Sequence, residues 1–312
     1  MGAGRGIPPA HGKLRLMSPK SDSQKIAQAL QAKVQGEVLS DDVALARYST
    51  DQSIYQIRPL VVVAPASLDD VAHVVRFAGQ EGLPLTPRAG GTNTAGSALG
   101  RGIVLAFSKA GPLNRILRFE QVTGEPRVTV EPGLLHDDLQ RFLRERELYL
   151  PADPSSGNIC LLGGNVATKA SGPHALKHGS IDRYLSHLRF VTAKGELVDT
   201  ADETTIPTYI QEGILGLRDQ ILTDRATMRR LEARKNMKLA SGYNLFAFLR
   251  QARLGELVAQ LLVGSVGTLG VVMEAASRAL RGGPGGDAAL FPPPGRGRRR
   301  GSAHQASGGG GN

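Results

Sequence analysis

One segment of this 312-residue chain, Pro59–Phe107, restricts the possible folds more than any other. It has a strand–helix–strand pattern followed by a glycine-rich loop and a further strand. The apolar run 59–64 predicts a buried strand. Ser67, with Asp70 three residues on, predicts the beginning of a helix, and Gly82 predicts its end. Further strands are expected at 83–86 and 103–107. The loop therefore leaves the end of a strand in an α/β unit, a place where loops commonly bind ligands.

The loop itself has the sequence PRAGGTNTAG, from Pro87 to Gly96. Its adjacent glycines allow several backbone N–H groups to face one side, which suits an anion such as a phosphate. From Gly91 the glycines have the spacing of a P-loop, but Ser97 stands where that motif requires lysine, and no Rossmann fingerprint is present. The loop therefore argues against an ATPase and leaves a plain surface loop as the alternative.

The formal net charge of +10 lies mostly at the two ends of the chain. Residues 1–20 carry four basic residues and no acid, and residues 281–312 carry five arginines and one aspartate, which leaves +2 for the remainder. The chain has no tryptophan and only 4% aromatic residues to stack on bases. We therefore expect no nucleic-acid partner.

A single cysteine, Cys160, leaves no pair for an intramolecular disulfide or a cysteine-based metal site, which is typical of the reducing cytoplasm. No apolar run approaches the roughly 20 residues that span a bilayer, and the first residues lack the apolar core of a signal peptide. Histidine and carboxylate motifs for a metal are also missing. The sequence predicts a soluble, cytoplasmic protein with no transmembrane segment and no metal.

Four segments are expected along the chain. They are a flexible N-terminus (1–20), a first subdomain (21–110), a second, α+β subdomain (111–280) and a disordered tail rich in glycine, proline and arginine (281–312). In the second subdomain we expect strands at 127–131 and 188–192, a hairpin through 193–199, and helices at 135–147 and 209–235. The basic residues of the last helix predict a solvated face rather than a binding surface.

Two more glycine-rich elements follow the first. Pro151–Gly179 has the sequence PADPSSGNICLLGGNVATKASGPHALKHG, and Gly264–Val272 has the sequence GSVGTLGVV after SGYNL at 241–245. Small residues after Gly163-Gly164-Asn165 leave room for a flat group. The first loop suits a phosphate, and the two later elements leave narrow spaces for a flat group. Together they suit a dinucleotide that carries a large planar ring.

Together these elements resemble the FAD-binding domain of the p-cresol methylhydroxylase (PCMH) and vanillyl-alcohol oxidase superfamily, over about residues 40–280. The nearest branch holds D-lactate dehydrogenases, D-2-hydroxyglutarate dehydrogenases and the glycolate oxidase D-subunit. Its motifs PRGGGTS, DPSS…CTIGGN, GP…LKYG and GYxL…GSEGTLG are matched in order. The resemblance implies an α+β, two-subdomain, PCMH-type FAD-binding fold, and an oxidoreductase in which a small 2-hydroxy acid gives a hydride from its α-carbon to flavin N5.

The resemblance also implies which residues surround FAD. Those expected at the pyrophosphate are Arg88, Gly90, Gly91, Thr92, Asn93, Thr94 and Ser97. Those expected along the flavin and ribityl chain are Pro154, Ser155, Gly163, Gly164, Asn165, Thr168, Ser171, His178 and Gly179, with Val271 near the adenosine. Thr92 stands where flavin-tethering relatives have histidine, so the FAD is expected to be noncovalent. Lys169 and Val266 replace a usual asparagine and glutamate.

In this branch a cap domain follows the FAD domain and supplies the carboxylate-binding arginine and the histidine base. Only 32 residues follow Leu280, so we expect the substrate cap domain to be absent and predict no catalytic residue. The composition of 281–312 favours a truncated or frameshifted, noncatalytic FAD-binding protein, and the alternative is an FAD subunit whose partner supplies the substrate site. A basic interaction protein with incidental glycines is the third hypothesis. The electron acceptor is not predicted.

Overall fold

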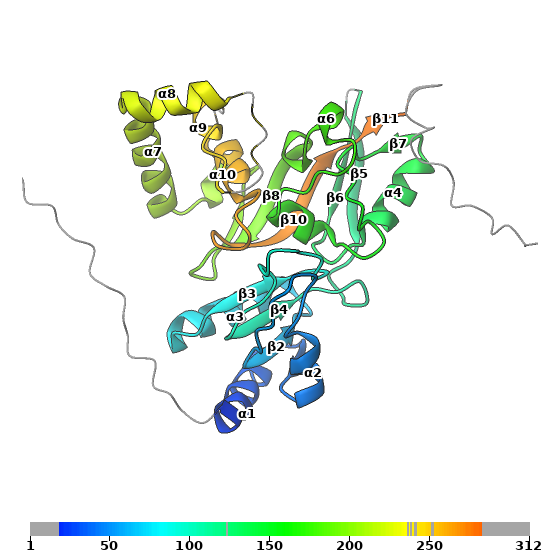
Figure 1. Cartoon of the computed structure of the whole chain (residues 1–312), viewed down its shortest axis with the longest axis vertical. Coiled ribbons are helices and arrows are strands. Elements are labelled where there is room, and N and C mark those ends of the chain that lie inside the picture. Colours follow the sequence, from blue (N-terminus) through cyan, green and yellow to red (C-terminus); the bar gives the residue numbers. More distant parts are fainter. Residues whose placement is uncertain are drawn as a thin grey trace, which may run out of the picture. The chain divides into compact units, whose positions relative to one another are not determined.

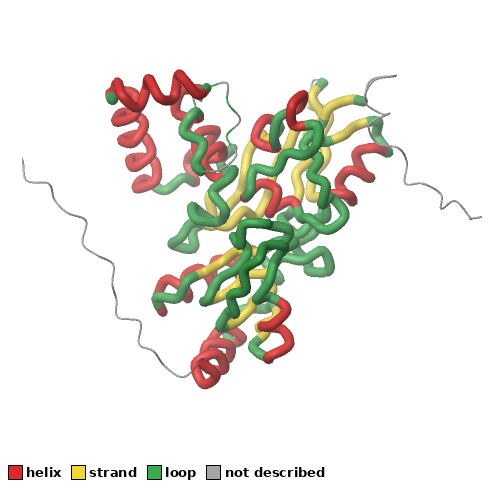
Figure 2. The backbone as a smooth tube through the Cα atoms, viewed as in Figure 1, coloured by secondary structure: helices red, strands yellow, loops and turns green. Residues whose placement is uncertain are grey.

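The computed structural model describes residues 19–122, 124–235, 237, 239, 242–250 and 253–282. The chain divides into two compact units, Met1–Leu280 and Arg281–Asn312. Most of the predicted N-terminus (1–18) and of the predicted tail (283–312) lies outside the described residues. The described part consists of helices, two main sheets and long loops (Figures 1 and 2).

The smaller sheet has four strands in the order β1-β2-β4-β3. Strands β2, β3 and β4 run parallel, and β1 is an antiparallel edge strand. The strands are β1 (Glu37–Leu39), β2 (Val61–Ala64), β3 (Leu85–Arg88) and β4 (Ile103–Ala106), and the helices are α1 (Pro19–Gln31), α2 (Asp42–Arg47) and α3 (Leu68–Glu81). Residues of α1 and α3 pack on Val61, Val63 and Ile103, whereas Leu45 of α2 packs on Val62 and Val104, so helices cover both faces of this sheet.

Local sequence signals set the ends of α3. The Ser67 hydroxyl accepts a hydrogen bond from the Asp70 amide at 3.2 Å, and Gly82 adopts the left-handed conformation with φ +63°. These are the cap residues that the sequence predicts, and the predicted helix is confirmed. The helix places an apolar face on the sheet and thereby supports β3, the strand that leads into the first glycine-rich loop.

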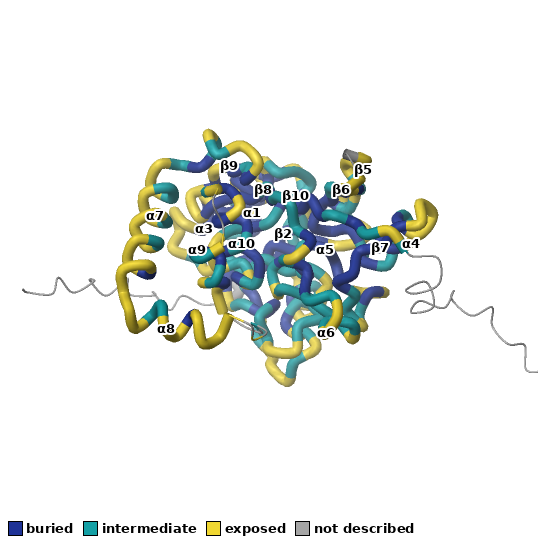
Figure 3. Tube along the Cα trace, turned by 90° about the horizontal axis from the view of Figure 1, so that it is seen from above, coloured by how far each residue is buried: buried dark blue, intermediate teal, exposed yellow. Residues whose placement is uncertain are grey.

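The larger sheet has five antiparallel strands in the order β5-β6-β10-β8-β9. They are β5 (Ile116–Val122), β6 (Glu125–Val130), β8 (Leu185–Val191), β9 (Leu197–Asp199) and β10 (Val271–Arg278). The remaining elements are α4 (His136–Arg144), β7 (Leu148–Tyr149), α5 (Leu162–Ala167), α6 (Ala175–His178), the 3-10 helices η1 (Ile181–Arg183) and η2 (Glu203–Thr205), α7 (Thr208–Thr223), α8 (Arg225–Arg234), α9 (Ala247–Arg250), α10 (Leu254–Leu262) and β11 (Leu280–Arg281). Leu139 and Leu143 of α4 and Val166 of α5 are buried in its core. Five of the eight residues of the central strand β10 are also buried, the class that Figure 3 draws in dark blue.

Two parts of the second half differ from the prediction. The expected single helix 209–235 is two helices, because Asp224 ends α7 and its carboxylate accepts hydrogen bonds from the Ala226 and Thr227 amides at the beginning of α8. In addition, no strand is predicted at Val271–Arg278, whereas β10 spans these residues and pairs with both β6 and β8. In the described part of the chain, no helix is long and apolar enough to cross a membrane.

Candidate functional site

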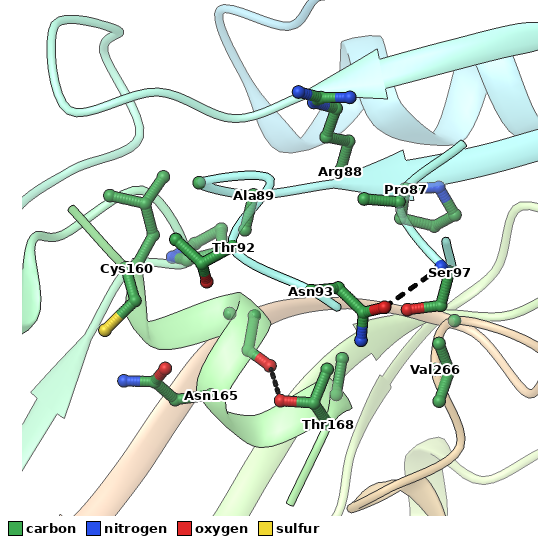
Figure 4. A pocket seen from close by; sticks show the side chains of 18 of the residues that line it. Pro87, Arg88, Ala89, Thr92, Asn93, Ser97, Cys160, Asn165, Thr168 and Val266 are labelled. Carbon is green, nitrogen blue, oxygen red and sulfur yellow. Dashed lines mark hydrogen bonds between the residues drawn. The ribbon is translucent and has the colours of Figure 1, made fainter. Parts of the chain in front are cut away.

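A cavity of about 250 Å³ lies where the three glycine-rich elements meet. Its lining residues come from the loop after β3, from the 154–170 segment that includes α5, and from the turn that precedes β10 (Figure 4). Thirteen residues predicted from the sequence to bind FAD line it: Arg88, Gly90, Gly91, Thr92, Asn93, Thr94, Ser97, Pro154, Gly163, Gly164, Asn165, Thr168 and Val271. Elements that lie far apart in the sequence therefore build one site.

The first loop presents unpaired backbone donors. Within the described residues, the amide N–H groups of residues 90–94 donate no hydrogen bond to another residue. The Asn93 carboxamide oxygen instead accepts hydrogen bonds from the amides of Ala95 at 2.7 Å and Ser97 at 3.1 Å, which folds the loop back on itself. Gly91 has φ +67°, a conformation that favours glycine. A row of free N–H groups on a folded loop suits a bound anion.

The first loop lies directly against the second glycine-rich element at Gly90. A Cβ atom at this position would stand 2.4 Å from the carbonyl oxygen of Ile159, a distance that no side chain tolerates. Glycine is required here because two backbones approach each other, and this contact holds the two loops together.

Arg88 lines the cavity, but its guanidinium group points toward the 48–51 segment. It donates to the Tyr48 carbonyl at 3.3 Å and lies over the Tyr48 ring, with Cζ 5.3 Å from the ring centroid. Burial lowers the pKa of Arg88, and the nearby Tyr48 and Asp51 oppose that shift. The side chain therefore anchors the strand end to the preceding segment.

The second wall is built from small residues of α5 and from a buried cysteine. The Thr168 hydroxyl donates to the Gly164 carbonyl at 2.8 Å (Figure 4). Burial raises the pKa of the Cys160 thiol above its ordinary value, with hydrogen bonds from Ser156 and Asn165 acting against that shift. A buried, protonated thiol is a packing group and a weak nucleophile.

The third wall is the turn before β10. The Val266 amide donates to the Ala167 carbonyl at 2.9 Å, and the Gly264 amide donates to the Val166 carbonyl at 3.1 Å. Val266 has φ +56°, which is unusual for a β-branched residue and marks local strain beside the cavity. These two hydrogen bonds dock the turn on the end of α5.

Four predicted residues, Ser155, Ser171, His178 and Gly179, do not line the cavity. The His178 ring makes an edge contact with the Tyr149 ring at 6.1 Å, and its carbonyl accepts a hydrogen bond from the Tyr184 hydroxyl at 2.8 Å. Sequence reasoning did not select Phe107 and Pro132, which do line it and belong to no glycine motif. Gly267 and Gly270 lie within the GSVGTLG motif, so that motif could have indicated them.

Comparisons with known proteins identify the domain. Residues 59–201 match the family described as FAD binding domain. D-2-hydroxyglutarate dehydrogenase of Pantoea ananatis is 34% identical over 241 residues, which cover 73% of this chain and 23% of that enzyme. The glycolate oxidase subunit GlcD of Escherichia coli K12 is 30% identical over 215 residues, which cover 65% of this chain and 42% of that subunit. The chain thus spans about a quarter to two fifths of these relatives.

Solved structures show the same fold. An alkyldihydroxyacetonephosphate synthase superposes with a TM-score of 0.57 at 19% identity, covering 83% of this chain and 40% of that one. The BBE-like 1 protein of Physcomitrella patens superposes with a TM-score of 0.55 at 15% identity, covering 82% of this chain and 44% of that one. The matched FAD-binding domain identifies a flavoprotein, and the solved structures show its fold. Residues 59–201 are similar to an FAD-binding domain, and the solved structures show that the chain has the fold of PCMH-type FAD-binding proteins. The predicted resemblance, fold class and FAD cofactor are confirmed.

The residues present fit FAD. Unpaired amides at residues 90–94 suit its pyrophosphate, and the small residues of α5 leave room for a flat ring system beside the second wall. The predicted contacts of individual residues with FAD, and the noncovalent attachment, stay predictions. Among the residues that the structure describes, no cluster of histidine, cysteine and carboxylate side chains could hold a metal ion.

Proposed function

We propose that this chain is the FAD-binding part of an oxidoreductase that oxidises a small 2-hydroxy acid. Relatives named D-2-hydroxyglutarate dehydrogenase and glycolate oxidase subunit support this reaction class. The observation that carries the proposal is the row of unpaired amides at residues 90–94, held at the cavity by a glycine contact with the second element. Bound FAD would supply the hydride acceptor.

The chain's own residues hold the cofactor in this proposal. Amides of residues 90–94 bind the pyrophosphate, and Gly163 and Gly164 let the flavin lie close to α5. Thr92 lacks the imidazole ring of the histidine that flavin-tethering relatives have at this position. Cys160 is buried and protonated, so neither residue tethers the flavin. The cofactor is therefore held without a covalent bond. We keep the cytoplasm as the proposed location, from the single, buried cysteine.

The substrate side is incomplete in the described cavity. Among its described lining residues Arg88 alone is charged, and its guanidinium points away toward Tyr48. Neither a second arginine for the substrate carboxylate nor a histidine to take the hydroxyl proton lines it. We therefore propose that these groups come from another part of a longer protein or from a partner.

Reconstitution with FAD tests the proposal. The purified chain should acquire the visible spectrum of bound flavin, and acid precipitation should release all of it into the supernatant. Failure to take up FAD would overturn the FAD assignment, and colour that stays on the pellet would overturn noncovalent binding.

Anaerobic mixing tests the incomplete substrate side. Dithionite should bleach the bound flavin, whereas D-2-hydroxyglutarate, D-lactate and glycolate should not bleach it at the rate of enzyme turnover. Without positioning groups the reaction lacks a contribution of about 7–11 kcal/mol to lowering the barrier. Rapid bleaching by any of these acids would show that the site is complete within this chain.

A noncatalytic FAD-binding protein is the second candidate, favoured by a described lining whose one charged residue, Arg88, turns its guanidinium toward Tyr48. Adding the remaining domains of a relative in trans, or fusing them to this chain, discriminates the two functions. Bleaching by a hydroxy acid only after that addition supports the oxidoreductase, and a flavin that stays oxidised with a functional added domain supports the noncatalytic protein.

A further inference from the structure

A buried histidine lies behind the second wall of the cavity. His136 is 0% exposed and is the first residue of α4, and its backbone amide donates to the Cys160 carbonyl at 3.1 Å. Its two ring nitrogens each face a side-chain amide. Nε2 lies 3.3 Å from Nε2 of Gln140, and Nδ1 lies 3.2 Å from Nδ2 of Asn165. A neutral imidazole has one N–H donor and one acceptor, so it cannot accept hydrogen bonds from both amide nitrogens.

The orientation of Gln140 is fixed independently of the histidine. Its Nε2 donates to the Leu150 carbonyl at 2.7 Å, and its Oε1 accepts from the Leu150 amide at 3.1 Å. Exchanging the nitrogen and oxygen of this carboxamide would set its NH₂ group against the Leu150 N–H and its oxygen against the Leu150 carbonyl oxygen. Gln140 therefore presents a donor to His136, and Nε2 of the histidine must be the acceptor.

The hydrogen of the ring is then on Nδ1. The Asp153 carboxylate also faces Nε2, but its Oδ1 is 3.7 Å away, beyond hydrogen-bond range. Nδ1–H needs an acceptor, and the group within reach is the carboxamide of Asn165, whose nitrogen and oxygen are interchangeable in position. The oxygen of Asn165 satisfies the histidine, whereas its nitrogen does not. With the oxygen on this side, the Asn165 NH₂ group no longer donates to the Cys160 thiol, and the protonated thiol can instead donate to that oxygen.

We propose that His136 is a positioning residue that holds Asn165 with Oδ1 on the imidazole and its NH₂ group toward the cavity. Asn165 is 4% exposed and lines the cavity, and in Figure 4 its carboxamide lies below Thr92 and beside Cys160. The second wall consequently offers the ligand a hydrogen-bond donor. The ligand atom opposite Asn165 is an acceptor, a carbonyl oxygen or an unprotonated ring nitrogen. Naming that ligand as the flavin rests on the proposed function.

Nitrogen-15 NMR on the FAD-free protein tests the tautomer directly. Protein labelled with ¹⁵N-histidine should show His136 with a protonated Nδ1 and an unprotonated Nε2, and the His136→Asn spectrum identifies its signals. A proton on Nε2 would overturn the proposal. This measurement needs no flavin, so a failure of FAD binding leaves its result intact and counts only against the proposed function.

Two matched substitutions test the positioning role. His136→Asn places an amide where Nδ1 stands and can donate to Asn165, whereas His136→Gln places its amide where Nε2 stands and leaves Asn165 without its donor. His136→Asn removes more volume than His136→Gln, so a loss of packing alone would weaken the Asn variant more, which is the reverse of the order that the positioning role predicts. We expect FAD affinity within about threefold of wild type for His136→Asn and a loss of about tenfold or more for His136→Gln, one tenfold step being about 1.4 kcal/mol.

The flavin absorbance separates positioning from packing. The bound spectrum of His136→Gln should shift relative to wild type, and that of His136→Asn should not. Equal affinity and equal spectra for the two variants would overturn the positioning role. If neither variant folds, the tautomer in the wild-type protein decides the proposal.

Discussion

Helices α3 and α7 have similar lengths and are held in place in different ways. The 14 residues of α3 include seven buried ones, and α7 buries only Ile221 among its 16 residues. Val74 of α3 is fully buried in the core of the smaller sheet, whereas Leu215, Leu217 and Leu222 of α7 are exposed. Most of α7 and α8 is yellow in Figure 3.

The difference in burial between α3 and α7 corresponds to their positions relative to the cavity. Helix α3 packs against β2 and β4 and lies between β2 and β3 in the chain, so its burial fixes the strand that carries the first loop. Helices α7 and α8 line no part of the cavity. A small cluster around Phe248 holds them, and Ile210 and Ile214 of α7 also pack against the core of the larger sheet. The region that must hold a ligand in a fixed geometry is stabilised by burial, whereas the α7–α8 region depends more on local caps.

Replacing Asp70 should have the largest effect on stability. This residue of α3 is 2% exposed, and its carboxylate accepts hydrogen bonds from the amides of Gln35, Gly36 and Ala66, each at 2.8 Å. Asp70→Ala leaves three donors unpaired and should lower the free energy of unfolding by about 3–4 kcal/mol. Urea unfolding measures this loss. The neighbouring, exposed Asp69→Ala is the control, and equal midpoints for the two variants would contradict the comparison.

Adding one methyl group to a glycine should weaken FAD binding in the first glycine-rich loop and leave it unchanged in α7. Gly90→Ala sets Cβ against the Ile159 carbonyl and forces the first two loops apart, which should weaken FAD binding about 10- to 100-fold, equivalent to about 1–3 kcal/mol. In α7, a Cβ at Gly213 meets no atom within 4 Å. Gly213→Ala should therefore leave FAD affinity unchanged and raise the free energy of unfolding by about 0.5–1 kcal/mol. Flavin titration and urea unfolding check both, and similar affinities would show that the loops need no close contact.

Shortening one apolar side chain in each helix should sharpen the comparison further. Val74→Ala removes a buried group and should cost about 2 kcal/mol. Leu215→Ala removes a larger side chain that is 45% exposed and should cost less than about 0.5 kcal/mol. Thermal or urea unfolding of the two variants measures the difference, and a larger loss for Leu215→Ala would indicate that α7 is covered in solution.

The smallest effect is expected at the cap of α8, and it depends on pH. A hydrogen bond from the Thr227 hydroxyl, followed by those from the Ala226 and Thr227 amides, lowers the pKa of Asp224 below its ordinary value. A lowered native pKa stabilises the fold above the unfolded pKa, and this contribution is lost as the pH falls through the native pKa. Asp224→Ala should therefore melt slightly below wild type at about pH 7, and by a smaller margin at about pH 3. An equal difference at both values would show that charge plays no part.

The sequence determined the features that depend on near neighbours. The caps of α3 follow from Ser67 and Gly82, because capping involves residues within one turn. The glycine-rich loops were predicted for the same reason, since two adjacent glycines permit a backbone that other residues do not. The break at Asp224 carried an equally local signal, an aspartate followed by Thr227, and the long helical pattern concealed it.

Only the tertiary structure decided what meets at the cavity. Phe107 and Pro132 line it because the two sheets bring β4 and the end of β6 to one place, and no periodicity encodes that meeting. The guanidinium of Arg88 points toward Tyr48, although the residue belongs to the predicted loop motif. His136 acquires its position behind Asn165 through contacts between α4 and α5. Contacts between segments distant along the chain depend on how whole elements pack, so a pattern of near neighbours cannot specify them.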